Sequence, residues 1–449
     1  MFKKLVKITI SIGALLAAST GVDAAEYNIN IYGAKAQYTY WSEAAPAFLY
    51  QKCNTTVQWA KDAADKQGIS YCDDYDTTHD EVYIRYASKA SYDGLYAVSG
   101  QDPLGNSGIC ADNERMMADE TNTNFGDYEP EGEAPEGVTG YACKDITVAA
   151  SDNDITGYDQ ESHGLRNGPS TAGNIWFDGE MKDLAWPPGF TPTIYNPFAI
   201  PYSFFRNANS TTSPNIDNIG LVYASLIFSG QITDWMTLDP TLTSSIPMVV
   251  CMRHAGSDSV AHLNAAVMSK SSFSLVKDQV LTTDISYIVG ASPAIYFNRE
   301  SSDMMRCVGG AGSREGYENY DGIGAIGYGY TGKVIVDGIT GEYHDVDGFG
   351  DIKLMSYANV YLRHNELVSK PDCFENYFWY YSLMVTDGSD PGGFVTALKS
   401  FAYDPANMPG YMANYMATCR EMKARKDTPY SDPSPASYPP LPPVKSSCF

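Results

Sequence analysis

The sequence of 449 residues offers little material for metal or cofactor chemistry. It has six histidines, and its nine cysteines form neither a CxxC pair nor a CxxCH motif for covalent haem. Neither residue type has the spacing of a metal cluster, and no serine nucleophile stands beside an evident base. We therefore expect no metal site, no cofactor and no catalytic residue, and an enzyme such as a secreted phosphatase has little support.

Positive charge is also scarce. The chain has 30 Lys and Arg against 54 Asp and Glu, which gives a formal net charge of −24. A protein of this charge is repelled by nucleic-acid backbones and by anionic lipid surfaces, so neither is expected as a partner. No apolar run beyond the N-terminus approaches the roughly 20 residues that cross a bilayer, which argues against stable membrane insertion.

The N-terminus has the pattern of a secretory signal peptide. Three lysines precede an apolar run over residues 8–18, and small residues lead to a cleavage site near Ala24 or Ala25. Removal of residues 1–25 takes away three lysines and one aspartate, so the charge of −24 becomes −26. No cysteine follows the apolar run, so no lipid anchor is expected there. We predict a periplasmic or secreted protein with a cleaved signal peptide.

The cysteines fit an oxidising compartment, in which disulfides form and persist. Sequence alone does not fix their connectivity, and pairing of neighbours along the chain is the simplest arrangement. This arrangement predicts the disulfides Cys53–Cys72, Cys110–Cys143, Cys251–Cys307 and Cys373–Cys419, and it leaves Cys448 over.

Strand and helix patterns alternate along the chain. The expected strands cover residues 27–32, 81–86, 145–152, 194–202 and 378–385, and the expected helices cover 42–60, 221–229, 271–280 and 393–401. Such alternation is typical of an α/β architecture with mainly parallel sheets.

Two segments depart from this alternation. Residues 102–140 form a long acidic insertion with little periodicity, bracketed by Cys110 and Cys143. A loop of that length in a compact domain is usually functional or mobile. The tail, residues 428–449, is rich in Pro and Ser, and we expect it to be flexible.

Residues 249–263 predict a short buried strand, a sharp turn and a helix that opens on Ser257, Asp258 and Ser259. Free backbone N–H groups and the dipole at a helix start attract oxyanions. Arg253, just before the turn, offers a planar fork of donors that suits a phosphate-like group. The alternative is that Ser257 is an ordinary N-cap and Asp258 an ordinary first-turn acid.

Three further polar turns follow expected strands, at Gln37–Tyr38, Ser91 and Asp152. Open α/β sheets bind ligands at such strand ends. These turns would join the turn at 253–259 if two lobes face each other. The alternative for Asp152 is that it caps a helix.

The order of short motifs resembles that of a known family. The motifs are Gly33-Ala34-Lys35-Ala36-Gln37-Tyr38, Ala90-Ser91-Tyr92-Asp93-Gly94, Ala150-Ser151-Asp152, Gly230-Gln231-Ile232-Thr233-Asp234-Trp235, Arg253-His254-Ala255-Gly256-Ser257-Asp258-Ser259 and Gly324-Ala325-Ile326-Gly327-Tyr328. In this order they resemble the phosphate-binding proteins of bacterial ABC transporters, which have the type II periplasmic binding-protein fold.

The resemblance implies an α/β, two-lobed type II periplasmic binding-protein fold with a long acidic insertion and a Pro-rich C-terminal tail. Hinge crossovers are expected near residues 197–202 and 331–336. The implied division is a signal peptide over 1–25, lobe 1 over 26–200 and 335–427, lobe 2 over 201–334 and a flexible tail over 428–449.

The resemblance also implies a function. Phosphate or a related tetrahedral oxyanion would be captured between the lobes, with an ABC-transporter permease as a partner. Asp152 takes the place of the family's aspartate, which accepts the proton of monohydrogen phosphate and repels sulfate, an ion without such a proton. The implied ligand-binding residues are Gln37, Tyr38, Ser91, Asp152, Arg253, Ser257, Asp258 and Ser259.

The chain departs from the family pattern at several of these positions. Gln37-Tyr38 stands where the family has Thr-Phe, Ala255 where it has Asp, and Asp258 where it has Gly. A second carboxylate that faces the anion would weaken phosphate binding. If only the backbone N–H of Asp258 faces inward, its side chain favours the helix dipole and does no harm.

A second function remains open. The acidic insertion, the 34 tyrosines and the number of cysteines also fit a phosphate-binding-like fold that is reused as a secreted or cell-surface interaction protein without a transport role. Permease and ATPase genes nearby would favour transport, and surface-assembly genes would favour the alternative.

Overall fold

The computed structural model describes residues 24–103, 105, 107–130, 132–153, 155, 158, 165–167, 174–176, 185–209, 216–253, 257–268, 285–287, 294–298, 301–311, 321–330, 335–336, 343–344, 350, 352–358, 378–403, 407 and 417–418. Most of the predicted signal peptide, the helix expected over 271–280, the predicted Cys373–Cys419 pair, Cys448 and the tail at 428–449 lie outside these residues.

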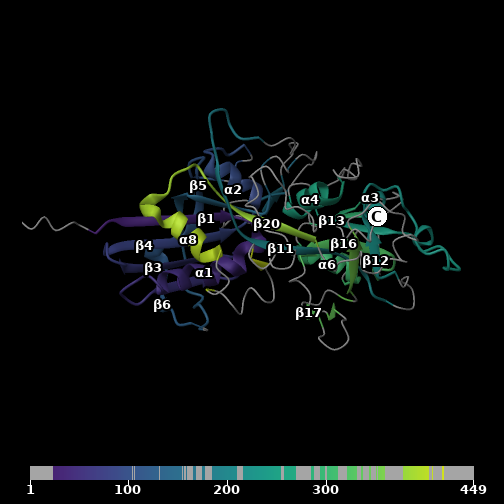
Figure 1. The fold of residues 1–449 in the computed structure, drawn as a ribbon, viewed down its shortest axis with the longest axis horizontal. Helices are drawn as coiled ribbons and strands as arrows, with labels where there is room; N and C mark the ends of the chain where they lie inside the picture. Colours follow the sequence, from purple (N-terminus) through teal and green to yellow (C-terminus); the bar gives the residue numbers. More distant parts are fainter. Residues whose placement is uncertain are drawn as a thin grey trace, which may run out of the picture.

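One large sheet organises the described part of the chain (Figure 1). Its strands follow the order β14 (Ile285–Tyr287), β15 (Ala294–Asn298), β13 (Val249–Arg253), β16 (Ala325–Tyr330), β11 (Thr193–Asn207), β20 (Phe378–Thr386), β8 (Val148–Ser151), β1 (Glu26–Gly33), β4 (Asp80–Ser88), β3 (Gln67–Tyr75), β2 (Gln58–Asp62) and β6 (Gly126–Asp127). Off this path, β19 (Ile352–Ala358) and β21 (Ala417–Thr418) pair with β11, and β12 (Asn218–Gly220) pairs with β19.

Three two-stranded sheets complete the described strands: β9 (Leu165–Asn167) with β10 (Asn174–Trp176), β17 (Ile335–Val336) with β18 (Tyr343–His344), and β5 (Glu114–Ala118) with β7 (Tyr141–Asp145). The helices are α1 (Tyr38–Tyr50), α2 (Ser91–Val98), α3 (Leu221–Phe228), α4 (Asp258–Leu263), α6 (Ser301–Gly309) and α8 (Phe394–Tyr403). None of the helices in the described ranges has the length and apolarity needed to span a bilayer.

The fold is α/β, as expected, but the sheet is mixed rather than mainly parallel. β1 runs parallel to both β4 and β8, and β13 runs parallel to β15 and β16. β3 is antiparallel to both β2 and β4, and the pairs β8 and β20, β20 and β11, and β11 and β16 are also antiparallel. The expectation of mainly parallel pairing was wrong because the short turns between β2, β3 and β4 allow antiparallel pairing only, since parallel neighbours need a long crossover.

One strand links the two ends of the molecule. β11 pairs with β20 along Thr193–Tyr202 and with β16 along Tyr202–Arg206. In Figure 1, α1, α8, β1 and β4 lie at one end and α3, α6, β13 and β16 at the other, with β11 and β20 between them. The hinge expected near 197–202 therefore lies within a continuous strand. Of the second expected hinge, near 331–336, residues 331–334 lie outside the described residues. The lobe boundaries stay a prediction.

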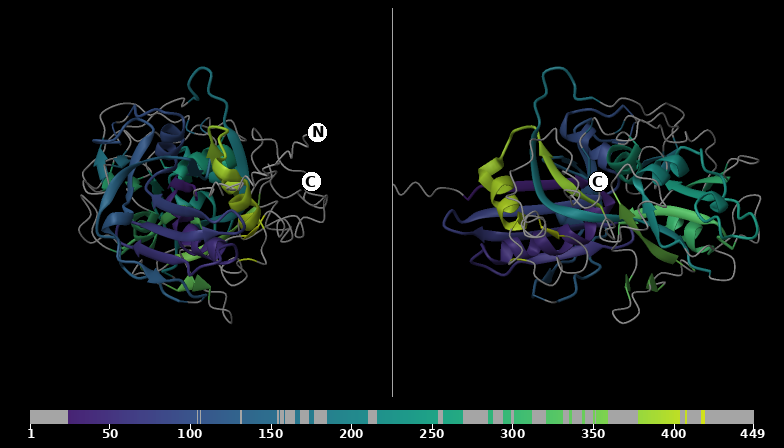
Figure 2. Two further views of the ribbon diagram at one scale, coloured as in Figure 1. Left: turned by 90° about the vertical axis from the view of Figure 1, so that its left-hand side faces the viewer. Right: turned by 45° about the vertical axis from the view of Figure 1, so that its right-hand side comes forward.

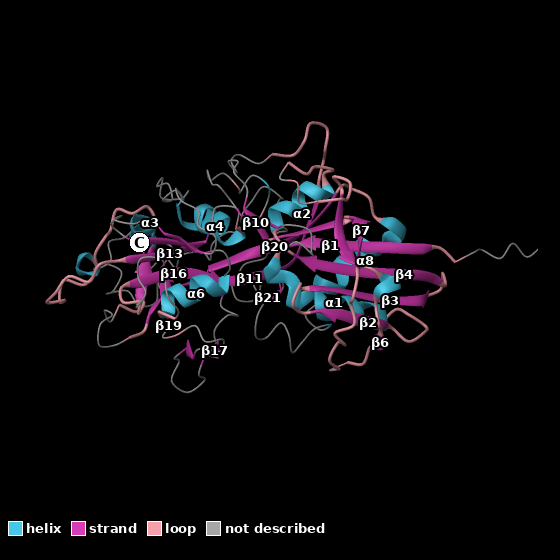
Figure 3. Ribbon diagram, turned by 180° about the vertical axis from the view of Figure 1, so that it is seen from behind, coloured by secondary structure: helices cyan, strands magenta, loops and turns pink. Residues whose placement is uncertain are grey.

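Helices cover both faces of the β1 end of the sheet. Successive residues of a strand point to opposite faces, and Ile31 packs in the cluster that holds α1 and α8, whereas Tyr32 packs in the cluster that holds α2. The end-on view of Figure 2 shows α8 (yellow) beside the purple strands of this end. Figure 3 shows the same helices from behind, against the strands that they cover.

The expected helix over 42–60 is shorter than predicted. α1 ends at Tyr50, and Gln58–Asp62 forms strand β2. The disulfide between Cys53 and Cys72 ties the intervening turn to β3, and the β-branched run Thr55-Thr56-Val57 favours extended backbone over helix. The strands over 27–32 and 81–86 and the helices over 221–229 and 393–401 are confirmed within one or two residues.

Three of the four predicted disulfides are present: Cys53–Cys72, Cys110–Cys143 and Cys251–Cys307. Their pairing follows proximity along the chain, as expected. The first joins the turn before β2 to β3, the second joins the insertion to β7, and the third joins β13 to α6.

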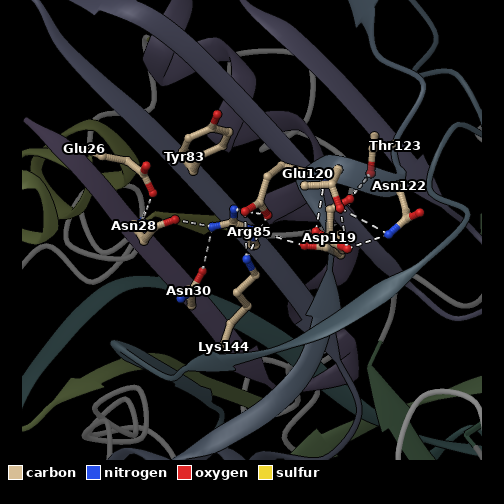
Figure 4. Close-up of polar contacts among 12 residues, drawn as sticks. Glu26, Asn28, Asn30, Tyr83, Arg85, Asp119, Glu120, Asn122, Thr123 and Lys144 are labelled. Atoms are coloured by element: carbon tan, nitrogen blue, oxygen red, sulfur yellow. Dashed lines mark hydrogen bonds and ion pairs between the residues drawn. The ribbon is translucent and has the colours of Figure 1, made fainter.

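The acidic insertion, in which the sequence shows little periodicity, contains strands and is folded against the sheet. Its strand β5 pairs with β7, and Figure 4 shows how the insertion meets β4 at Arg85. The guanidinium of Arg85 is buried and donates to the carbonyl of Ala118 at 3.1 Å and to Glu120 at 2.7 Å. Lys144 from β7 donates to the same carboxylate at 2.8 Å. Long-range charge pairing rather than hydrophobic periodicity orders this segment, which explains why its pattern was missed.

Candidate functional site

The carboxyl ends of three parallel strands lie at one edge of the sheet, because β4, β1 and β8 run in the same direction. β1 ends at Gly33, which has a φ of 143°, and a Cβ there would lie 2.1 Å from the carbonyl oxygen of Ala150. This close approach lets the N–H of Ala34 donate to the same oxygen at 2.8 Å. Asp152, just beyond β8, and Ser91, the first residue of α2, therefore lie at this edge.

Gln37 holds Asp152 in place. Its amide Nε2 donates to the Asp152 carboxylate and to the carbonyl of Ser151, both at 3.0 Å. Its Oε1 accepts from the indole N–H of Trp41 at 2.9 Å. Both polar ends of the buried Gln37 amide therefore have hydrogen-bond partners within the protein, and Gln37 acts on the site by orienting Asp152.

Tyr38 lies outside this group. Its ring packs against that of Tyr86, with 5.9 Å between the centroids. Burial and the carboxylates of Glu136, Asp62 and Glu43 raise the pKa of Tyr38 to about 12. These acidic surroundings do not suit an anion. The structure does not bring Tyr38 together with the other predicted residues.

Asp258 connects α4 with the segment that follows β8. The Tyr158 hydroxyl donates to the Asp258 carboxylate at 2.5 Å, and Asn153 Nδ2 donates to the Asp258 backbone carbonyl at 3.2 Å. The Ser91 hydroxyl and the Asp152 carboxyl lie near enough to act on the pKa of the Asp258 carboxyl. The side chain, and not only the backbone N–H, therefore faces the other predicted residues.

The charge on Asp258 is constrained by these neighbours. Burial raises the pKa of the Asp258 carboxyl above its ordinary value, although Ser91, Tyr158, Arg253 and Asp152 all act in the opposite direction. Because burial is the larger cause, the protonated form of this carboxyl is favoured more than that of an exposed aspartate.

The serines of the α4 turn have structural partners. Ser257 is the N-cap, and its Oγ accepts from the backbone N–H of Ser259 at 3.2 Å. The Ser259 hydroxyl lies 2.8 Å from the Tyr202 hydroxyl of β11. The reading of Ser257 as an N-cap is therefore confirmed. α4 itself has six residues, so its dipole is small.

Arg253 is the last residue of β13, and its side chain is buried and oriented by two residues of the neighbouring elements. Its Nε donates to the carbonyl of Asn298 at 3.2 Å, and its Nη1 donates to the Ser301 hydroxyl at 2.7 Å. Its charge also lowers the pKa of Asp258, which places the guanidinium within electrostatic range of that carboxyl.

His262 lies one turn further along α4, beside the Asp152 backbone. Burial lowers the pKa of the His262 imidazole well below its ordinary value, and a hydrogen bond with the Asp152 backbone opposes this shift. The ring is therefore neutral at physiological pH and adds no positive charge to the site.

Sequence reasoning missed several residues of the site. Asn153, Asn298 and Ser301 lie at or just beyond the ends of β8 and β15, so position at a strand end was the available signal. Tyr202 lies inside β11, and its contact with Ser259 reveals it. Tyr158 follows a stretch without clear periodicity, and only its tertiary contact with Asp258 reveals it.

Solved structures similar to this chain carry names that refer to phosphate. The chain is similar to an ABC-type phosphate transport receptor from Vibrio cholerae, with 12% identity, a TM-score of 0.39 and coverage of 87% of this chain and 99% of that one. It is also similar to PstS from Borrelia burgdorferi (12% identity, TM-score 0.36, 87% and 98% covered) and to a human phosphate binding apolipoprotein (13% identity, TM-score 0.42, 88% and 93% covered).

At identities of 12–13% and TM-scores of 0.36–0.42, the similarity by itself assigns no ligand to this chain. No family model and no curated protein matches the sequence.

Proposed function

We propose that this chain is an exported solute-binding protein that captures phosphate or a related tetrahedral oxyanion between two lobes. The observation that carries this proposal is the meeting of two distant turns: Asn153, just after β8, donates to the backbone of Asp258 at the start of α4. This contact supports a common site with Asp152 and Ser91 on one side and the start of α4 on the other.

The chemistry of the assembled groups suits a protonated oxyanion. Arg253 offers a cationic fork of donors, and the Ser91 and Tyr158 hydroxyls offer neutral donors that hold an anion without a large desolvation cost. Asp152 is an acceptor for a proton on the ligand, which phosphate has and sulfate lacks. Binding rather than catalysis is proposed, because these groups supply neither a nucleophile with a base nor a metal ligand set.

Export and transport are part of the same proposal. The basic and apolar N-terminus supports a cleaved signal peptide and a periplasmic or secreted location. Disulfides at three positions favour an oxidising compartment. An ABC-transporter permease is the proposed partner, by resemblance of the motifs.

Equilibrium titration tests the ligand. Phosphate, arsenate, sulfate and molybdate are titrated into the mature protein and followed by calorimetry. We expect saturable binding of phosphate and arsenate that is tighter than that of sulfate. Absence of binding of all four ions at millimolar concentration, in the wild type and in Asp258→Gly, contradicts the proposal.

One observation favours a second function, that of a secreted or cell-surface interaction protein without a transport role. The Asp258 carboxyl stands among the donors of the site and accepts the Tyr158 hydroxyl that an anion would need. A carboxyl of the protein thus takes the position at this donor that an anion would occupy. If Asp258→Gly fails to produce oxyanion binding, this second function becomes the better explanation.

A further inference from the structure

Part of the acidic insertion lies along the free edge of strand β2. β2 pairs with β3 on one side, and its other neighbour in the sheet is β6 of the insertion (Figure 3). β6 has two residues, whereas β2 has five, so β6 alone would leave most of the outward N–H and C=O groups of β2 open to another strand. Residues 124–130 and 132–138, here called the edge strap, cover more of this edge than β6 does.

The two limbs of the edge strap bond to different halves of β2. On the outgoing limb, the N–H of Tyr128 donates to the carbonyl of Val57 at 2.8 Å. On the returning limb, the carbonyl of Pro135 accepts from the N–H of Lys61 at 2.9 Å, and the N–H of Val138 donates to the carbonyl of Lys61 at 3.4 Å. The backbone groups that β2 turns away from β3 therefore already have partners within the same chain.

Side chains on both faces of the sheet hold the edge strap in place. Tyr128 packs edge-to-face on Trp59, with 4.9 Å between the ring centroids, and both belong to the main hydrophobic core. Val138 belongs to a smaller cluster that contains Ala60. Because Trp59 and Ala60 are successive residues of β2, they point to opposite faces, so the edge strap contacts the edge of the sheet from both sides.

The outer side of the edge strap offers little to another strand. Pro130 and Pro135 lack the N–H that a ladder of hydrogen bonds needs. Asp127, Glu129 and Glu133 are exposed, and two copies that met here would bring these like charges together, in a protein whose formal charge is −24. Covering β2 in this way therefore does not create a new edge for pairing.

We infer that the edge strap keeps β2 from pairing with a second copy of this chain. The partner that fits the uncovered edge is the β2 strand of that copy, because an antiparallel pair about a two-fold axis matches the outward donors of each strand with acceptors of the other. This gives part of the acidic insertion a role that is separate from the proposed ligand site.

Excision of the edge strap tests this inference. The N–H of Asn124 donates to the carbonyl of Gly137 at 2.8 Å, so the two ends of the strap adjoin, and a two-residue Asn-Gly turn can replace residues 125–136. The wild type and the excised chain are compared by sedimentation equilibrium at increasing protein concentration. The mass of the wild type should stay constant, and the average mass of the excised chain should rise toward twice its starting value.

A single backbone donor separates strand pairing from contact between newly exposed apolar side chains. The N–H of Lys61 is bonded to the edge strap, and in the excised chain Lys61→Pro removes this donor while Lys61→Ala keeps it. Lys61→Pro should restore a constant mass, and Lys61→Ala should not. Both substitutions remove the lysine charge, so the effect of charge cancels in the comparison. Circular dichroism establishes that each variant is folded.

Hydrogen exchange in the intact protein gives a second measurement that needs no variant. The amides of Lys61, Tyr128 and Val138 should exchange together, because all three are released when the edge strap leaves the edge of β2. In the excised chain, the Lys61 amide should become more protected as the protein concentration rises.

The outcomes are distinct. Self-association of the excised chain that Lys61→Pro abolishes and Lys61→Ala does not supports the inference. A folded excised chain of constant mass overturns it, and so does self-association that persists in Lys61→Pro. If the excised chain does not fold, exchange in the intact protein decides: rapid exchange of the Lys61 amide would show that the edge is open and overturns the inference, and joint slow exchange of the three amides supports it. None of these measurements involves phosphate, so a failure of the proposed function is seen separately.

Discussion

Arg115 of the insertion and Asp93 of α2 form a buried ion pair, with 2.8 Å between Nη2 and Oδ1 and each side chain 1% exposed. The Tyr32 hydroxyl of β1 donates to the other oxygen of Asp93 at 2.8 Å. The pair thereby joins the insertion, the sheet and the helix that begins at Ser91. The insertion thus helps to position one wall of the proposed ligand site.

Arg115→Ala should destabilise the protein strongly. It leaves the Asp93 carboxylate buried without its cation, and breaking a buried pair in this way costs about 3–5 kcal/mol. Urea unfolding followed by circular dichroism measures the loss. Lys353→Ala is the control, because its ion pair with Asp217 is 38% and 50% exposed and should be worth less than about 1 kcal/mol. Similar losses in the two variants would show that the Arg115 pair does not anchor the insertion.

Arg253→Ala should weaken phosphate binding. The loss of a hydrogen bond to a charged ligand costs roughly 1.5–3 kcal/mol, which corresponds to about 10- to 200-fold in the dissociation constant. Calorimetric titration checks it. Arg306→Ala is the matched control, since Arg306 pairs with Asp303 on α6 and its side chain is 42% exposed. An unchanged affinity in Arg253→Ala would remove this residue from the site.

Asp152→Asn should relax the discrimination against sulfate. The amide replaces an obligate acceptor by a group that also donates, so phosphate binds more weakly while the repulsion of sulfate disappears. Titration of both ions into the same preparation gives the ratio of their affinities. A ratio equal to that of the wild type would mean that Asp152 does not face the anion.

The Cys251–Cys307 disulfide should contribute substantially to stability. It joins β13 to α6 across a sequence separation of 56, and closure of a loop of that length stabilises a fold by about 4 kcal/mol in the chain-entropy model. The double variant Cys251→Ala, Cys307→Ala should therefore unfold at lower urea concentration. Thiol counting in the denatured, unreduced wild type should find at most three of the nine cysteines free. Five or more free thiols would contradict the disulfide assignment.

Stability should fall as the pH is lowered through the His262 transition. The pKa of the folded-state imidazole lies well below that of the unfolded chain, so between the two values the unfolded state binds more protons and stability rises with pH. The effect is at most about 1.4 kcal/mol per pH unit below the ordinary histidine pKa near 6.5. Urea unfolding at a series of pH values measures it. His262→Gln should lose this dependence, and an unchanged slope would show that another group causes it.

The sequence by itself determined the local features. Alternating apolar residues specify β1 and β4, because such a pattern buries one face of a strand wherever that strand is placed. Ser257 caps α4 because its hydroxyl reaches the N–H of Ser259 within the same turn. The pairing of Cys53 with Cys72 and of Cys110 with Cys143 follows from short separations along the chain.

Only the tertiary structure decided the features that depend on distant partners. Gln37 and Tyr38 are adjacent in sequence, yet one holds Asp152 and the other packs on Tyr86 among carboxylates. The insertion has no periodicity to reveal its order, because its order comes from Arg85 and from Arg115 pairing across the fold. Whether the side chain or the backbone of Asp258 faces the site could not follow from its place at a helix start. The hydrogen bond from Tyr158 fixes it, since it brings together residues 100 positions apart.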